Sequence, residues 1–179
     1  MQKVHDGNFW ECYVENAEKG MMYKYKIYGA DGSCIDHCDP YGFYSELRPN
    51  NASIIYDTTD YHFTDAEWMK KRSVQKDAPL NLYEIHFGSW RKKDDEDPTG
   101  WYTYREMADL LIPYLNENGY NYVELMPLSE HPCDESWGYQ NTGFFAPTSR
   151  YGTPDDLRSF VTACPTHKLG VLMAFVQVN

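Results

Sequence analysis

The sequence contains no long apolar run. None of its hydrophobic stretches approaches the roughly 20 residues of a membrane-spanning helix, and the start, MQKVHDGNFW, lacks the apolar core of a secretory signal. Basic residues are also few: 16 Lys and Arg against 27 Asp and Glu leave a net charge of −11. Such a charge repels phosphate backbones and anionic lipid. We therefore expect a cytoplasmic protein with no nucleic-acid or membrane partner, and with a neutral or cationic ligand.

Cysteine is scarce, and its pattern favours reduced thiols over a disulfide framework. The five cysteines are odd in number and scattered, at Cys12, Cys34, Cys38, Cys133 and Cys164. Only Cys34 and Cys38, with His37 between them, lie close together. A zinc site would need a second ligand pair at regular spacing, which the sequence does not offer. We expect free thiols, no metal and no cofactor.

Aromatic residues, in contrast, are abundant, with 16 Tyr, 8 Phe and 5 Trp making up 16% of the chain. Large flat rings with a polar tip serve hydrophobic cores, and they also stack on the apolar faces of sugar rings. Composition alone does not separate these two uses.

The first third of the chain has the alternation of antiparallel strands. FWECYV alternates, MMYKYKIY separates Met22, Lys24 and Lys26 from Tyr23, Tyr25 and Ile27, and SIIY at 53–56 predicts one more short strand. The dipeptide at 31–32, Asp-Gly, predicts a tight turn. Residues 58–79 then become polar and charged, which indicates a linker with a short helical turn and a solvated basic run at 70–72.

After residue 79 the pattern predicts alternating strands and helices. LYEIHF (82–87) and YVELM (122–126) are expected strands, and between them a capping box at Thr103 and Glu106 begins an amphipathic helix that Pro113 should kink and Gly119 should end. A second helix begins at Thr153, and the apolar residues 171–176 are typical of a strand covered on both faces. This order implies a parallel α/β sheet or barrel.

The long segment between residue 126 and residue 153 is where we expect function. Stretches of this length without periodicity are usually functional loops, and this one leaves the carboxyl end of a predicted parallel strand. It contains SWGYQNTGFFAPTSRYG, in which aromatic rings alternate with neutral amides and hydroxyls. Such side chains suit a carbohydrate, although about half of the rings could simply hold the loop in place.

Several motifs in this order resemble a known family. YEIHFGSWR (83–91), VELMPLSEHP (123–132), SWGYQNTGFFAPTSRYGTPDDL (136–157) and GVLMAFV (170–176) are similar to the first three barrel strands of the α-amylase superfamily, and the WGYQ and APTSRYGTP forms resemble those of 1,4-α-glucan branching enzymes. Upstream, GNFWECYV, YKYKI and DPYGFYSELRPNNASIIYD resemble the later strands of the carbohydrate-binding module that precedes the barrel in these enzymes.

The resemblance implies an α/β fold in two incomplete parts. Residues 80–179 would form the first three strands of a (β/α)8 TIM barrel. Residues 1–57 would form the C-terminal part of an all-β immunoglobulin-like carbohydrate-binding module, with residues 58–79 as the linker.

The resemblance also implies a chemistry and a partner. Branching enzymes of glycogen biosynthesis cut an α-1,4-glucan and transfer the segment to a 6-hydroxyl through a covalent intermediate. This retaining chemistry needs two carboxylates about 5 to 5.5 Å apart, which in the family follow the fourth and fifth barrel strands. The acids of this chain match neither position: Glu84, Glu124, Glu130, Asp134 and Glu135. We therefore assign no catalytic residue and expect this chain by itself to be inactive.

Substrate-binding residues carry over more directly. Tyr139 matches the family tyrosine that stacks on the sugar at the cleavage point, and Trp137 and Gln140 match the positions flanking it. His86 is interpreted as a support inside the barrel rather than as a catalytic group.

The end of the chain departs from the family. An Asp and a His that bind the same sugar are replaced by Ala174 and Asn179, and a proline by Gln177. Two alternatives therefore stay open: a glucan-binding protein without catalysis, or part of a debranching or trehalose-releasing hydrolase, which the SWGYQ and SRYGTP forms disfavour.

Overall fold

The computed structural model describes residues 1–4, 8–72, 77–97 and 99–176. Its helices are α1 (Ala66–Lys71), α2 (Phe87–Trp90), α3 (Tyr104–Glu117) and α4 (Pro154–Thr166), with short 3₁₀ helices at Asp134–Ser136 and Ser149–Tyr151. Its strands are β1 (Gln2–Val4), β2 (Phe9–Glu11), β3 (Met22–Tyr23), β4 (Tyr25–Tyr28), β5 (Cys34–His37), β6 (Ser53–Ile54), β7 (Leu82–Ile85), β8 (Tyr122–Leu125), β9 (Ser129–Glu130), β10 (Gly143–Pro147) and β11 (Gly170–Met173).

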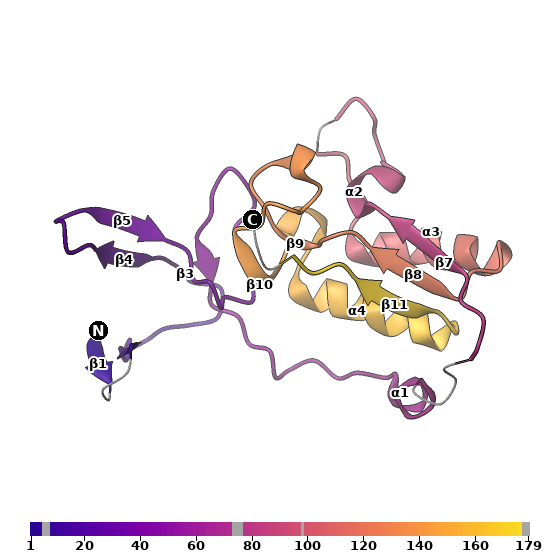
Figure 1. Ribbon diagram of the computed structural model, residues 1–179, viewed down its shortest axis with the longest axis horizontal. Helices are drawn as coiled ribbons and strands as arrows, with labels where there is room; N and C mark the ends of the chain where they lie inside the picture. The colour runs from indigo at the N-terminus through magenta and orange to yellow at the C-terminus, as the bar shows by residue number, and fades with distance from the viewer. Residues whose placement is uncertain (5–7, 73–76, 98, 177–179) are drawn as a thin grey trace.

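A parallel sheet of β11, β8 and β7, in that order, forms the centre of the molecule. Both outer strands pair in parallel with β8, which confirms the predicted strand, helix, strand unit. Figure 1 shows α3 and α4 behind this sheet, so that helices cover one of its faces. The strands do not close into a barrel within the residues that the structure describes.

The two long helices begin where their side chains predict. Thr103 and Glu106 form the capping box of α3, and Thr153 and Asp156 form a second box at α4, in which Pro154 occupies the first turn. α3 ends at Glu117, with Gly119 just beyond it at a φ of 74°. Pro113 lies inside α3, and the helix continues through it.

The core lies between these helices and the sheet. Met107, Leu111 and Leu115 lie at the expected helical spacing and are fully buried against the sheet residues Val123 and Leu125. Fully burying side chains of this size stabilises a fold by about 1.5 to 3 kcal/mol each. The amphipathic pattern of residues 104–117 therefore predicted both the helix α3 and the face of it that packs on the sheet.

Two strand predictions differ from the structure. β7 ends at Ile85 and not at Phe87, because Phe87 begins α2 and turns its ring into the core. The prediction that residues 171–176 are covered on both faces is wrong: β11 is an edge strand, and Leu172 and Met173 are 42% and 48% exposed. Within the described residues, no helix covers the front of the sheet (Figure 1) and no strand pairs with the outer side of β11, so an apolar sequence was not sufficient evidence of burial.

The N-terminal third forms short antiparallel pairs. β1 pairs with β2, β3 with β6 and β4 with β5, and the β4–β5 hairpin extends away from the parallel sheet (Figure 1). The predicted turn at residues 31–32 closes this hairpin. Tyr23 and Tyr25 lie on one face, as their alternation predicts, since both hydroxyls donate to Asp39, at 2.6 and 3.2 Å.

The segment between these parts contains the short helix α1. Lys70, Lys71 and Arg72 are exposed, as a solvated basic run predicts. Within the described ranges, no helix combines the length and apolarity needed to cross a bilayer.

Candidate functional site

The long segment after β8 lies at the carboxyl ends of the parallel strands. It begins next to β8 and forms the antiparallel pair of β9 and β10 before reaching α4 (Figure 1). Asn141 donates to the carbonyl oxygen of Val176, at 3.0 Å, and thereby joins the segment to the chain that follows β11. We call residues 127–152 the site loop.

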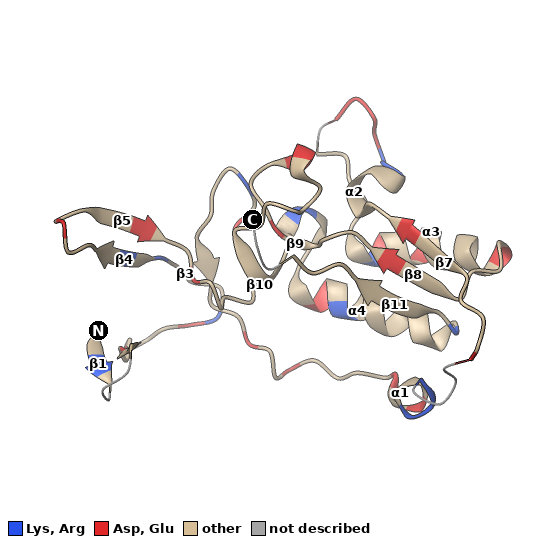
Figure 2. Ribbon diagram, viewed as in Figure 1, with Lys and Arg blue, Asp and Glu red and all other residues tan. Residues whose placement is uncertain are grey.

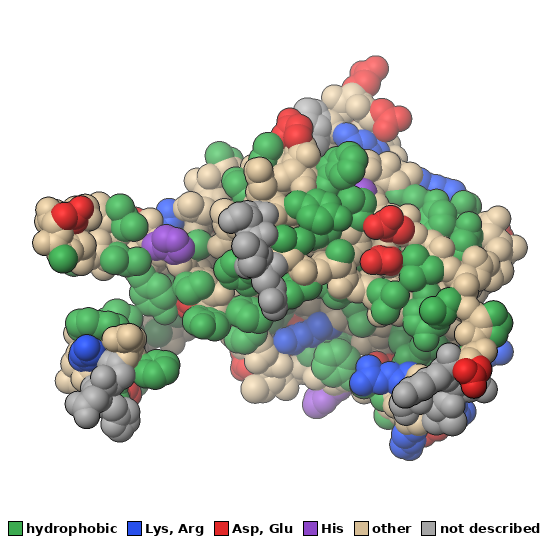
Figure 3. Space-filling model, viewed as in Figure 1, with side chains coloured by type: hydrophobic (Ala, Val, Ile, Leu, Met, Phe, Trp, Pro, Cys, Tyr) green, Lys and Arg blue, Asp and Glu red, His purple; other side chains and the backbone are tan. Residues whose placement is uncertain are grey.

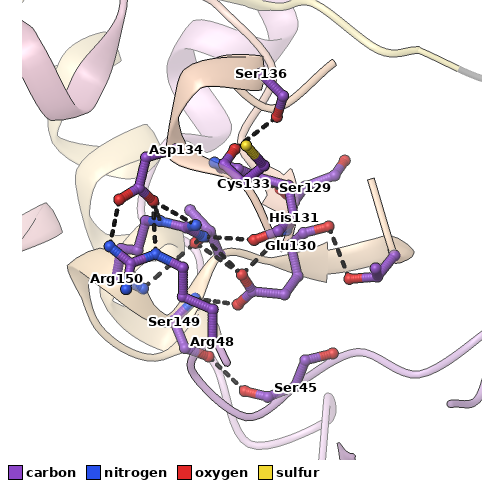
Figure 4. Close-up of polar contacts among 12 residues, drawn as sticks. Ser45, Arg48, Ser129, Glu130, His131, Cys133, Asp134, Ser136, Ser149 and Arg150 are labelled. Carbon is purple, nitrogen blue, oxygen red and sulfur yellow. Dashed lines mark hydrogen bonds and ion pairs between the residues drawn. The ribbon is translucent and has the colours of Figure 1, made fainter. Parts of the chain in front are cut away.

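Two arginines from distant parts of the sequence hold the site loop. Arg150 pairs with Glu130 at 2.9 Å and with Asp134 at 2.6 Å, and its side chain is 1% exposed. Arg48 binds the same Asp134, with 2.7 Å between Nε and Oδ1 and a second contact from Nη2 to Oδ2. Figure 4 shows both guanidinium groups converging on this carboxylate. We call Arg48, Glu130, Asp134 and Arg150 the arginine clamp.

Nearly every polar atom of the clamp has a partner. Arg150 also donates to the carbonyl oxygen of His131 and to the Thr148 hydroxyl, at 2.9 and 3.0 Å. Glu130 accepts from the backbone N–H groups of His131 and Ser149, at 3.0 and 2.7 Å. Since buried charges are tolerated only when they are paired and hydrogen-bonded, this arrangement fixes the backbone on both sides of the site loop.

The pKa values of the carboxylates in the clamp are shifted in opposite directions. Hydrogen bonding by Arg48, and then by Arg150, lowers the pKa of Asp134 to about 2. Burial raises the pKa of Glu130, although Arg150 and the two backbone amides act in the opposite direction. Burial and the charge of Arg150 lower the pKa of His86. The two arginines therefore keep Asp134 ionised, whereas burial, together with the charge of Arg150, favours a neutral His86 at neutral pH.

The clamp is followed by an unusual turn. The 3₁₀ helix Asp134–Ser136 ends at Trp137, whose φ of 52° lies in the left-handed region, and Gly138 follows with a φ of 84°. A Cβ at residue 138 would lie 2.2 Å from the carbonyl oxygen of Pro127, so only glycine fits there. This turn exposes the side chains on either side of Gly138.

The residues predicted to bind sugar lie together on this turn. Trp137 and Tyr139 are 54% and 40% exposed, and Gln140 is exposed beside them. The Trp137 ring lies 6.1 Å from the His86 ring, measured between centroids. Their roles in binding are not tested by this geometry and stay predictions.

His86 and the remaining acids lie in different surroundings. His86 is half-buried at the end of β7 and bonds the Ser89 hydroxyl at 2.7 Å, which agrees with a supporting position, while its interior place in a barrel stays a prediction. Glu84 and Glu124 are paired across β7 and β8 (Figure 2), on the sheet face that the helices leave open. Glu135 accepts from the Cys133 thiol at 2.8 Å.

The cysteine pair with His37 does not come together as a unit. Cys34 is exposed at the turn end of β5, opposite Tyr28. Cys38 is buried and donates to the carbonyl oxygen of Thr142, at 3.2 Å, so that it contacts the site loop. Three residues were noted above as differing from the family pattern. The backbone N–H of Ala174 donates to the carbonyl oxygen of Leu125, whereas Gln177 and Asn179 lie outside the described residues.

The sequence did not indicate the clamp. Arg48 and Asp134 are 86 residues apart, and Arg150 stood in a motif without an assigned role. Three charged residues within one long aromatic loop, Glu130, Asp134 and Arg150, were the available signal, since charges inside an otherwise packed loop need partners.

Comparisons with known proteins show what the chain is similar to. The model for carbohydrate-binding module 48 (isoamylase N-terminal domain) matches residues 1–42. The 1,4-alpha-glucan branching enzyme GlgB of Bacillus caldolyticus is 49% identical over 178 residues, and that of Geobacillus stearothermophilus is 46% identical. These alignments cover 98% of this chain but only 26% and 27% of the relatives, so the chain spans about a quarter of their length.

A solved structure shares the fold. The crystal structure of a putative alpha amylase from Salmonella typhimurium matches with a TM-score of 0.67 and 28% identity, over 89% of this chain and 24% of that one. Together these matches confirm the resemblance that the WGYQ and APTSRYGTP motifs carry. Over 98% of its length the chain is similar to 1,4-alpha-glucan branching enzymes, and its first 42 residues match carbohydrate-binding module 48.

Proposed function

We propose that this chain is part of a glycogen branching enzyme and supplies the sugar-stacking side of its substrate site. The whole enzyme would cut an α-1,4-glucan and transfer the segment to a 6-hydroxyl. The observation that supports this role is the exposed Trp137, Tyr139 and Gln140 on a braced turn at the carboxyl ends of parallel strands, where α/β folds bind ligands.

The proposal extends to the architecture. Residues 80–179 would be the first part of a (β/α)8 barrel, of which β7, β8 and β11 are three strands, and residues 1–57 the later part of an immunoglobulin-like module, joined by residues 58–79. The one-sided sheet supports this division, because its uncovered face carries the alternate residues that a barrel would enclose.

The partner would be a neutral α-1,4-glucan. The chain's net charge of −11 leaves neutral hydroxyls as better partners than phosphates, and the exposed rings offer stacking faces. We also propose a cytoplasmic location, supported by five cysteines that are all free thiols.

We propose that the chain alone does not catalyse transfer. Among the five candidate acids, Glu130 and Asp134 are bound by arginines, and Glu135 is exposed beside Cys133. Glu84 and Glu124 lie opposite each other across β7 and β8, but neither matches the positions of the family's two carboxylates, which follow the fourth and fifth barrel strands. Incubation with amylose, followed by counting of α-1,6 branch points, should give no product above background; clear branching would refute this part.

Binding should be measurable even without catalysis. Retention of the chain on an amylose gel should fall by about fivefold or more on Tyr139→Ala, because stacking on an aromatic ring contributes roughly 1 to 3 kcal/mol. Tyr139→Phe is the matched control, since it keeps the ring and should keep most of the retention. If the unaltered chain is not retained, the binding role is wrong.

A second candidate function is a glucan-binding protein without catalysis. Ala174 favours it, because its methyl group stands where the resemblance expects a sugar-binding carboxylate. Retention on amylose by the longest natural form of the protein, with no branching by that same form, would support this candidate over the first.

A further inference from the structure

The arginine clamp is connected to the exposed rings of Trp137 and Tyr139, because Asp134 is the first residue of the turn that carries them. Its backbone carbonyl accepts the N–H of Trp137, at 3.1 Å. Two residues later, the N–H of Tyr139 donates to the carbonyl of Ser136, at 2.9 Å. The backbone of the turn is therefore hydrogen-bonded to Asp134 at Trp137 and to Ser136 at Tyr139.

The two arginines hold Asp134 in different ways. Arg150 is buried and is also bound by Glu130, His131 and Thr148, so its guanidinium group has little freedom to move away from the Asp134 carboxylate. Arg48 comes from the other side, out of the segment that precedes the linker (Figure 4). It uses two nitrogens on two oxygens of Asp134, which is the two-pronged geometry that restricts rotation of a carboxylate.

Arg48 is itself held in position. Its guanidinium carbon lies 5.4 Å from the centroid of the Trp101 ring. The chain nearby is tied down as well, because the Ser149 hydroxyl donates to the carbonyl oxygen of Ser45. The N-terminal segment thus contacts the site loop at more than one residue, through Ser45 as well as through Arg48.

The turn needs such support. A residue other than glycine in the left-handed region costs of the order of 1 kcal/mol or more, and persists only where surrounding contacts impose it. Trp137 is such a residue, and its ring is more than half exposed, so core packing does not impose the conformation. The hydrogen bond from its N–H to Asp134 is one contact that can, and the close approach of Gly138 to Pro127 is another.

We infer that Arg48 is a positioning residue for the sugar-stacking turn: through Asp134 it holds Trp137 and Tyr139 in the orientation that meets a glucan. The residue lies in the part of the chain proposed to be the carbohydrate-binding module, so the module would shape the binding surface of the site loop. Only the nature of the ligand rests on the proposed function.

Amide hydrogen exchange of the full chain tests the inference without any ligand. In Arg48→Ala, the amides of Trp137 and Tyr139 should exchange about tenfold faster, while those of Leu111 and Leu115 in the core helix stay unchanged. The matched control is Arg105→Ala, which removes an exposed ion pair with Asp156 and should leave the turn unaffected.

A conservative variant distinguishes a local effect on the turn from general unfolding of the chain. Arg48→Lys keeps the charge and the long stem but not the two-pronged contact, and should accelerate exchange at the turn alone, by less than the alanine variant. Unchanged exchange at Trp137 and Tyr139 in both variants would overturn the inference. So would acceleration in both variants that is as large in α3 as in the turn.

Binding of maltoheptaose gives an independent readout. Arg48→Ala should weaken the affinity by about tenfold, and should add less than tenfold when combined with Tyr139→Ala, because both changes remove the Tyr139 contact while only Trp137 remains to be disturbed. Additive losses in the double variant would mean that Arg48 acts elsewhere. If the unaltered chain binds no maltoheptaose, the proposed function fails, and the exchange experiment still decides whether Arg48 positions the turn.

Discussion

Gly138 is the residue at which the site loop has least freedom. Its φ is 84°, and the space where a Cβ would lie is occupied by backbone, the carbonyl of Pro127. A flexible side chain could move away, but a main-chain carbonyl next to β8 cannot do so without shifting the sheet. The strained turn is therefore fixed at one end by the clamp and at the other by this close contact.

We predict that Gly138→Ala lowers the free energy of unfolding by more than 1 to 2 kcal/mol, the approximate cost of left-handed backbone alone. Gly119→Ala is the matched control, because Gly119 has a similar φ of 74° with nothing within 4 Å of its added Cβ. Urea unfolding of both variants measures the difference between their free energies of unfolding, and this difference is the cost of the clash with Pro127. Equal losses in the two variants would show that this contact is unimportant.

At the scale of elements, α3 and α4 depend on capping boxes. Thr103 and Thr153 each accept a backbone N–H three residues ahead, at 3.2 Å, and Glu106 and Asp156 return the contact. The two helices pack side by side over the same core, so their first turns determine how the sheet is covered.

We predict that Thr103→Ala or Thr153→Ala destabilises the chain by about 1 kcal/mol each. Thr103→Ser should retain most of the stability, because it keeps the accepting oxygen. Thr99→Ala, which removes a hydroxyl in an exposed turn, should have little effect. Urea midpoints of the four variants give the comparison, and an equal loss for Thr99→Ala would argue against a specific capping contribution.

At the scale of the whole molecule, much apolar surface is left uncovered. The accessible surface is 11910 Å², whereas a compact monomer of 20.9 kDa has roughly 9,000 Å². Figure 3 shows hydrophobic side chains gathered over the open face of the sheet, on both sides of acidic ones.

The contact of Arg48 with Asp134 joins the N-terminal segment to the site loop and is ionic, so it should respond to acid. Because the folded pKa of Asp134 is about 2, below the ordinary value near 3.9, its pairing stabilises the fold fully above about pH 4 and is lost as the pH falls through 2. We predict that Asp134→Asn is less stable than the unaltered chain at pH 6, and that the difference shrinks between pH 4 and pH 2. Urea unfolding across this range measures it; a difference independent of pH would contradict the assignment.

The sequence determined the local parts of this protein. Helix starts at Thr103 and Thr153, the stop at Gly119, the apolar face of α3 and the parallel order of β7 and β8 all follow from residues a few positions apart, because capping and periodicity are short-range effects. The motifs of the site loop were equally local, and they sufficed to indicate the resemblance that the curated relatives confirm.

Tertiary structure decided what depends on distant neighbours. Whether Leu172 and Met173 were buried depended on how many faces of the sheet are covered, which an apolar run does not encode. The meeting of Arg48 with Asp134 across 86 positions has no period and no spacing rule. An ion pair needs only proximity in space, and that proximity arises from the fold as a whole.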